Sequence, residues 1–145
     1  MNRVERAVSC FKEGFSCSQA LLSTYGPQLG LNHELALKVS GAFGGGMGRM
    51  GETCGAVTGA FMVIGLKYGN ARVEDKQAKE RAYSLVREFV DRFKSRNGSI
   101  VCRELLGYDI STPEGMKLIK ERKLTTTLCP KFVQDAAEII AQILE

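Results

Sequence analysis

Apolar residues recur along this chain with the three- and four-residue spacing of amphipathic helices. No stretch alternates apolar and polar residues with period two for long enough to form a sheet. The pattern therefore predicts an all-α protein. The expected helices cover about residues 2–13, 17–25, a segment that begins after Asn32, 54–68, 73–95 and 130–144, with shorter elements at Cys102 and at Thr112.

One of these helices differs from the rest because it is apolar on all sides. Residues 56–66 carry almost no polar side chains, and about eleven residues are too few to span a bilayer. We interpret the segment as a buried central helix. With 145 residues, of which 44% are hydrophobic, the chain fits one domain over residues 1–145. The predicted fold is a single-domain helical bundle with a glycine-rich loop before the buried helix.

That loop, residues 44–51, holds five glycines in eight positions and leads to Cys54 at the start of the buried helix. Glycine lets the backbone approach a ligand closely or adopt a positive φ angle, at a cost in unfolded-state entropy. Helix N-termini have unpaired N–H groups and the positive end of the helix dipole, which stabilise a thiolate. Cys54 is therefore a candidate redox residue or ligand.

Three other cysteines also lie where helices are expected to begin. Cys17 follows Ser16, a plausible N-cap, Cys102 follows an Asn-Gly-Ser segment, and Cys129 precedes a proline and a strongly periodic run. Cys10 differs because it lies inside the first amphipathic segment, where a small buried hydrophobic residue is expected.

Charge and composition narrow the classes of function. The net charge of +4 is mild, basic and acidic residues are mixed, and tryptophan is absent. No basic stripe alternates with aromatic residues, so we expect no nucleic-acid binding. Neither a signal-peptide pattern nor an apolar run of transmembrane length is visible, which predicts a cytoplasmic protein without membrane insertion. In a reducing cytosol, five cysteines indicate metal-binding or redox-active thiols.

The order of the cysteines, with the central motif Cys54-Gly55-Ala56-x-x-Gly59, resembles the C_GCAxxG_C_C family of small redox-active proteins. The resemblance extends over nearly the whole chain, and Cys10 stands outside the pattern. It implies a cysteine-dependent redox or iron–sulfur protein that acts in electron transfer with an oxidoreductase or a transporter-associated partner.

Four thiols allow several chemistries. Cys17, Cys54, Cys102 and Cys129 are the candidate ligands of an iron–sulfur cluster, although no Cys-x-x-Cys pair is present. A zinc site in a metal-delivery or accessory module without turnover is an alternative. A third is a dithiol–disulfide pair, with Cys54 and Cys17 as the redox-active candidates. A fourth is a set of unconnected buried cysteines.

Loop residues are the candidates for holding a cofactor, and the remaining singular residues are weaker candidates. Backbone N–H groups of Gly45, Gly46, Gly48 and Gly55 could bind a cofactor, and the Arg49 side chain could pair with an anionic cluster or substrate. For the other residues the sequence predicts structural roles: His33 is expected at the surface, Met47 and Met50 as lid or core side chains, and the threonines at 125–127 as capping groups.

Overall fold

A computed structural model describes residues 1–145 and is all helical, as the sequence pattern predicted. The only strand-like feature is one antiparallel bridge between Thr53 and Val101. The elements are α1 (Arg3–Lys12), α2 (Cys17–Tyr25), the 3-10 helix η1 (Pro27–Leu29), α3 (His33–Ser40), α4 (Gly55–Tyr68), α5 (Lys76–Asn97), α6 (Cys102–Leu106), α7 (Pro113–Glu121), α8 (Leu124–Thr127) and α9 (Cys129–Ile143).

Side-chain caps set most of the helix starts. The Ser16 hydroxyl accepts the Gln19 N–H at 3.3 Å while the Gln19 side chain accepts the Ser16 N–H at 2.9 Å, which makes a capping box at the start of α2. Asp75 caps α5 by accepting the N–H of Ala78, so this helix begins three residues later than the apolar pattern suggested. The expected start at Val73 was wrong because that side chain is 87% exposed, so its burial does not extend the helix to this residue.

The threonines before Cys129 also differ from the expectation. They form α8, and the hydroxyls of Thr126 and Thr127 donate to the backbone carbonyl of Lys123 within that short turn. They therefore stabilise α8 and do not cap α9.

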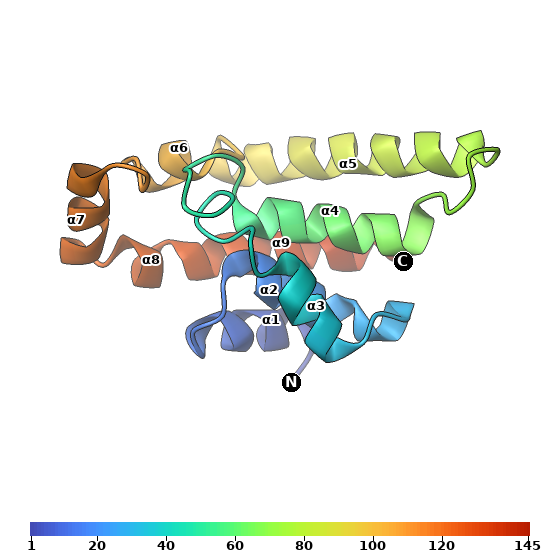
Figure 1. The fold of residues 1–145 in the computed structure, drawn as a ribbon, viewed down its shortest axis with the longest axis horizontal. Coiled ribbons are helices and arrows are strands. Elements are labelled where there is room, and N and C mark those ends of the chain that lie inside the picture. The colour runs from blue at the N-terminus through green and yellow to red at the C-terminus, as the bar shows by residue number, and fades with distance from the viewer.

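Helix α4 lies at the centre of the molecule, with the long helices α5 and α9 packed against it and against each other (Figure 1). Helices α1 and α2 pack on α9, α2 also packs along α4, and α3 covers α2. Helices α6, α7 and α8 form one end of the molecule beyond the start of α4 (Figure 1). The apolar surface all round α4 is explained by these neighbours, because its first ten residues are buried except Phe61 and Met62, which are partly so.

Aromatic side chains link the three central helices. Ring centroids lie 6.1 Å apart for Phe61 and Phe89, 5.9 Å for Phe89 and Phe93, and 6.4 Å for Phe93 and Phe132. Truncating a buried phenylalanine to alanine costs about 3–5 kcal/mol, so this row accounts for a large part of the packing of α4, α5 and α9. The Tyr25 hydroxyl donates to the Ala137 carbonyl at 3.0 Å and ties α2 to α9.

A cluster of charged and polar side chains links α5 to α9. The Asp135 carboxylate, on a largely buried residue, accepts hydrogen bonds from Lys131 at 2.6 Å, Asn97 at 3.1 Å and Arg96 at 3.2 Å. Burial raises the pKa of Asp135, but these three donors outweigh it and leave that pKa below its ordinary value. None of the helices is long and apolar enough to cross a membrane.

Candidate functional site

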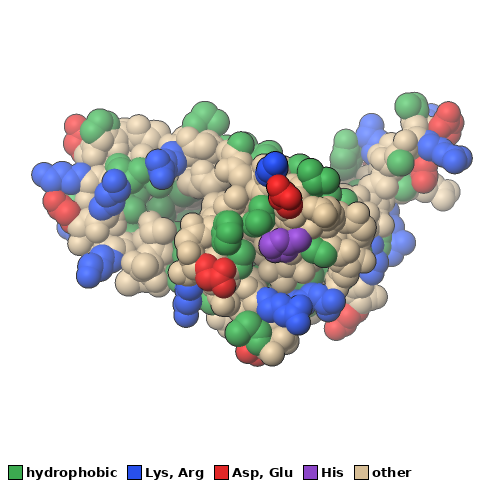
Figure 2. Space-filling view, turned by 60° about the horizontal axis from the view of Figure 1, so that its bottom comes forward, with side chains coloured by type: hydrophobic (Ala, Val, Ile, Leu, Met, Phe, Trp, Pro, Cys, Tyr) green, Lys and Arg blue, Asp and Glu red, His purple; other side chains and the backbone are tan.

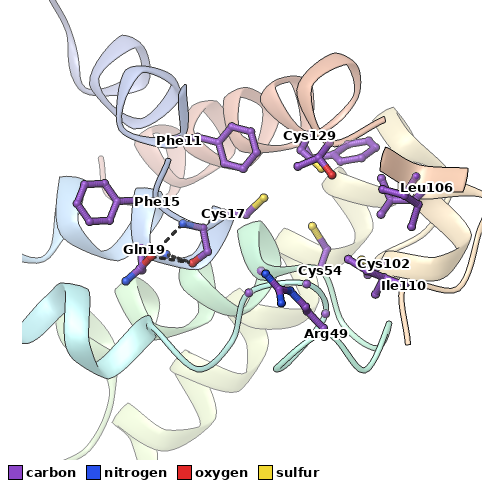
Figure 3. Close-up of a pocket in the computed structure, with 18 of the residues that line it drawn as sticks. Phe11, Phe15, Cys17, Gln19, Arg49, Cys54, Cys102, Leu106, Ile110 and Cys129 are labelled. Carbon is purple, nitrogen blue, oxygen red and sulfur yellow. Dashed lines mark hydrogen bonds between the residues drawn. The ribbon is translucent and has the colours of Figure 1, made fainter. Parts of the chain in front are cut away.

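The four cysteines that the sequence placed at helix starts line one open cavity of about 940 Å³. Cys17 is the first residue of α2, Cys54 is the N-cap of α4, and Cys102 and Cys129 are the first residues of α6 and α9. The sulfur atoms of Cys17, Cys54 and Cys129 point into the same space (Figure 3). All five cysteines are free thiols in this structure.

Cys10 lies apart from this cavity. Its sulfur is 3.7 Å from the Ser23 hydroxyl in the interface between α1 and α2. Burial raises the pKa of the Cys10 thiol, which suits the packing role that the sequence suggested.

Two glycines of the central motif bring α2 close to α4. A Cβ atom added at Gly55 would lie 3.0 Å from the backbone nitrogen of Ser18 and 3.2 Å from the Cβ atom of Cys17. A Cβ atom added at Gly59 would lie 2.9 Å from both the Ser18 carbonyl oxygen and the Leu21 Cβ atom. The spacing of four residues puts both glycines on the face of α4 that meets α2. The motif therefore allows the helix approach that places Cys17 beside Cys54.

A short antiparallel pairing brings the start of α6 to the same place. The Cys54 N–H donates to the Ile100 carbonyl at 2.7 Å, and the Cys102 N–H donates to the Glu52 carbonyl at 2.6 Å. The Cβ atom of Cys102 packs on Gly46, where an added Cβ atom would lie 2.7 Å away. The pairing thus joins the glycine loop (residues 44–51) and its continuation to the Cys102 segment.

The thiols differ in acidity because of their positions. The Cys17 thiol donates a hydrogen bond to Cys54, and the backbone N–H groups of Ala56 and Val57 add to this effect, so the pKa of Cys54 is lowered despite its burial. Hydrogen bonding to Cys129 and Cys54, together with burial, raises the pKa of Cys17 well above its ordinary value. Among Cys17, Cys54 and Cys102, Cys54 therefore loses its proton most readily.

Cys102 stays protonated for a different reason. Burial, followed by repulsion from the neighbouring Cys54 and Cys129, raises the pKa of Cys102 to about 12. A thiol with this pKa is a poor nucleophile at neutral pH, since the thiolate is the reactive form.

Solvent has little access to Cys54. The residue is only 5% exposed, whereas Cys17 is half-buried. Cys54 lines the open cavity, so a reagent reaches this residue through the cavity.

The glycine loop holds Arg49 at the mouth of the cavity. Gly45, Gly46, Gly48, Arg49 and Gly55, the residues predicted to hold a cofactor, all line the cavity. Arg49 is exposed and has a φ of 64°, a backbone conformation that costs energy in a non-glycine residue. At Gly45, which has a φ of 68°, an added Cβ atom would lie 2.7 Å from Cγ of Arg49. Gly45 therefore makes room for the arginine side chain, which lies next to Cys54 in Figure 3.

Several lining residues carried no signal in the sequence. Lys12 at the end of α1 and Lys120 in the last turn of α7 line the cavity, and aromatic walls come from Phe11, Phe15 and Phe132. A lysine in the last turn of a helix is common because it complements the helix dipole, so the sequence gave no reason to place either at a site. His33 and Met50 are exposed, as expected of surface and lid residues, and Met47 is half-buried.

The donor set of four cysteines suits a thiolate-binding metal or an iron–sulfur cluster, but its arrangement does not. No group of three or more cysteine, histidine or acidic side chains is placed so that it could hold a metal ion. The metal-ligand roles of the four cysteines stay predictions.

The fold and the cavity define a small helical protein that collects four free thiols at one site, with one thiol acidified. The family described as "Putative redox-active protein (C_GCAxxG_C_C)" matches residues 15–143. The chain belongs to this family, as its cysteine order suggested. No curated protein and no solved structure matches the chain significantly.

Proposed function

We propose that Cys54 and Cys17 form a thiol–disulfide redox pair in which Cys54 is the nucleophile and Cys17 resolves the mixed disulfide. The observation that carries the proposal is the proximity of the two residues: Cys54 is the N-cap residue of α4, the Cβ atom of Cys17 packs against the next residue, Gly55, and the Cys17 and Cys54 sulfur atoms point into the same space in Figure 3. A nucleophilic thiol held at a helix N-terminus beside a second thiol is the arrangement that thiol–disulfide exchange requires.

The reaction has two exchange steps. The Cys54 thiolate attacks one sulfur of a substrate disulfide, that S–S bond breaks, and the departing thiolate takes the electron pair. Cys17 then gives its proton to the departed thiolate and attacks the Cys54 sulfur of the mixed disulfide. The Cys17–Cys54 bond forms and the second substrate thiolate leaves, so two electrons pass from the cysteine pair to the substrate.

Cys102 and Cys129 have supporting roles in this scheme. Cys102 remains a thiol because of its high pKa, and the Cys129 sulfur points into the same space as that of the resolving Cys17 (Figure 3). A partner oxidoreductase, which the family resemblance implied, would restore the dithiol by thiol exchange at the more exposed sulfur, that of Cys17.

Oxidation of the reduced protein with 4,4′-dithiodipyridine tests the proposal, because release of 4-thiopyridone can be followed optically. We expect two equivalents in a fast phase and a Cys17–Cys54 disulfide in the peptide map. The Cys17→Ser variant should stop after one equivalent with the adduct on Cys54, and Cys54→Ser should lose the fast phase. The matched variant Cys10→Ser should behave as wild type in this phase. A Cys17–Cys129 disulfide, or a second fast equivalent from Cys17→Ser, would contradict the assignment.

The gathering of four thiols at one cavity favours a second candidate, a metal-bound form of the protein. An iron–sulfur cluster in electron transfer, or zinc in an accessory module, would require the side chains of Cys17, Cys54, Cys102 and Cys129 to draw closer together than they are here. Anaerobic purification followed by visible spectroscopy and by iron, sulfide and zinc analysis tests this candidate. Stoichiometric iron with sulfide, or stoichiometric zinc, supports it, and a colourless metal-free protein with intact fast thiol chemistry excludes it.

A further inference from the structure

The cavity above Cys54 contains positive charge that no acidic residue balances. Lys12, Arg49 and Lys120 are the only charged side chains among its lining residues. None of the three forms an ion pair within the protein. All three are exposed, so they lie at the mouth, whereas Cys54 is almost completely buried. A ligand that enters must pass this cationic mouth before it reaches the thiolate.

Below the mouth the walls are apolar. Phe11, Ile110, Met116 and Phe132 line the cavity, and Figure 3 shows Phe11 and Ile110 around the cysteines. The surface in Figure 2 shows apolar side chains recessed between Lys and Arg side chains at the end of the molecule where α7 and α8 lie. Small-molecule sites commonly combine apolar walls with a few polar groups in a volume of about 300–1,000 Å³, and this cavity has about 940 Å³.

The location of the thiolate selects a small molecule over a protein disulfide. A disulfide on a folded protein surface cannot reach a sulfur atom whose residue is 5% exposed at the floor of a concave site. A small organic molecule can enter, because the cavity is open to solvent at the cationic mouth.

We propose that this cavity binds a small organic disulfide whose apolar body carries a carboxylate or another anionic group, with that anion held by Arg49. The inference rests on the proposed function of Cys54 and names the substrate class for it. Gly45 leaves space for the Arg49 side chain, which lies next to Cys54 in Figure 3. The aromatic walls contact the apolar body, Arg49 contacts the anion, and the disulfide lies against the Cys54 sulfur. Lys12 and Lys120 add attraction at the mouth.

Two aromatic disulfides test the charge requirement. 5,5′-Dithiobis(2-nitrobenzoate) is anionic, and 4,4′-dithiodipyridine is neutral at pH 8. Rate constants with the reduced Cys10→Ser protein are measured by stopped flow and divided by those of N-acetylcysteine. This division removes the intrinsic reactivity of each reagent. We expect the anionic reagent to be favoured by about tenfold or more, with the preference falling as salt is added.

Arg49 variants identify the group responsible. In Arg49→Gln the anionic preference should fall by about three- to tenfold, which is the range of one lost charge-assisted contact, while Arg49→Lys should retain most of it. The matched control Arg87→Gln removes an exposed charge on α5, outside the cavity, and should change neither rate. Lys120→Gln should reduce the preference less than Arg49→Gln. A change in the thiolate fraction of Cys54 alone would change the rate constants of both reagents by the same factor. The ratio of the two rate constants therefore isolates the effect of Arg49 on the anionic reagent.

Glutathione disulfide separates charge from the apolar walls, because it is anionic and lacks an aromatic body. We expect it to react more slowly than the aromatic anion after the same normalisation. A faster reaction would show that the walls do not contact the substrate and would overturn that part of the inference.

The outcomes separate the two proposals. Fast reaction of Cys54 with the neutral reagent, combined with an anionic preference that is absent or unchanged in Arg49→Gln, overturns the substrate class and leaves the redox pair intact. Slow reaction of Cys54 with both reagents overturns the redox pair and the substrate class together. Loss of the anionic preference in Arg49→Gln, with the preference kept in Arg49→Lys and Arg87→Gln, supports both the redox pair and the substrate class.

Discussion

Replacing Gly59 with alanine should destabilise the protein, whereas the same replacement at Gly65 in the same helix should stabilise it. Both glycines lie within α4, but only Gly59 faces a close neighbour. The pair therefore separates the helix propensity of alanine from the approach of α2 to α4.

The structure gives the magnitudes. An added Cβ atom at Gly65 has nothing within 4 Å, so only the propensity gain of about 0.5–1 kcal/mol remains. At Gly59 the atom would lie 2.9 Å from the Ser18 carbonyl oxygen, 2.9 Å from the Leu21 Cβ atom and 3.1 Å from the Ser18 Cα atom. Because two of these are backbone atoms, α2 must move, and overpacking of this kind costs about 1–3 kcal/mol. The net loss at Gly59 is then up to about 2.5 kcal/mol, opposite in sign to the change at Gly65.

Thermal unfolding under reducing conditions, followed by circular dichroism, measures this difference. For a chain of this length, 1 kcal/mol corresponds to a shift of about 2–4 °C in Tm. Gly59→Ala should also slow formation of the Cys17–Cys54 disulfide, because Ser18 follows Cys17 and moves with α2. Gly65→Ala should leave that rate unchanged.

Stability and the rate of disulfide formation test the helix contact and the position of Cys17 separately. A Gly59→Ala protein as stable as Gly65→Ala would show that the close approach of the two helices is not limiting. A destabilised Gly59→Ala protein with an unchanged rate of disulfide formation would show that this approach does not position Cys17.

The other predictions concern the loop, the charged cluster and the buried thiol. Gly45→Ala and Gly48→Ala, both at positive φ, should each lose about 1 kcal/mol of unfolding free energy. Only Gly45→Ala should slow reaction with the anionic disulfide, because at Gly48 the nearest atom would be 3.7 Å away; equal kinetics would refute this. Asp135→Asn should cost about 1–2 kcal/mol at neutral pH, since it removes a charged acceptor. The pKa of Asp135 is lowered in the folded state, so its contribution is complete above the ordinary aspartate pKa and is lost as the pH falls through the folded-state pKa. Urea unfolding from pH 7 to pH 2 should show the two proteins converging, and a constant difference would contradict this. Cys102, with a pKa of about 12, should be alkylated after Cys54 at neutral pH in a mass-spectrometric time course, and the reverse order would be incompatible with these pKa shifts.

The helices could be predicted from the sequence because their signals are local. Apolar spacing and caps such as Ser16 and Asn32 lie within a few residues of the helix ends that they set. The same locality explains the error at Val73, where the spacing continued although no partner helix is present to bury the side chain. Propensity and periodicity describe a segment and do not describe its neighbours.

The positions of the four cysteines at helix starts were also predictable, but their convergence on one cavity required the fold. The pairing that brings Cys102 to Cys54 involves a single bridge, too short to leave a period-two pattern. Lys12 and Lys120 are far apart in the sequence and face the cavity only because α1 and α7 border it. Such long-range placements depend on the packing of several helices and are not encoded in any one segment.

The charge of the cavity connects the oxidation state of the cysteine pair to ligand binding. When Cys54 is deprotonated in the reduced protein, its negative charge offsets part of the positive charge of Lys12, Arg49 and Lys120. In the disulfide form that negative charge is gone, so an anionic thiol at the mouth is attracted more strongly. Reciprocity then requires that a bound anion stabilise the disulfide form and lower the reduction potential of the pair. A neutral thiol of the same shape would lack this effect, so anionic and neutral ligands should differ in how they shift the potential as well as in how fast their disulfides react.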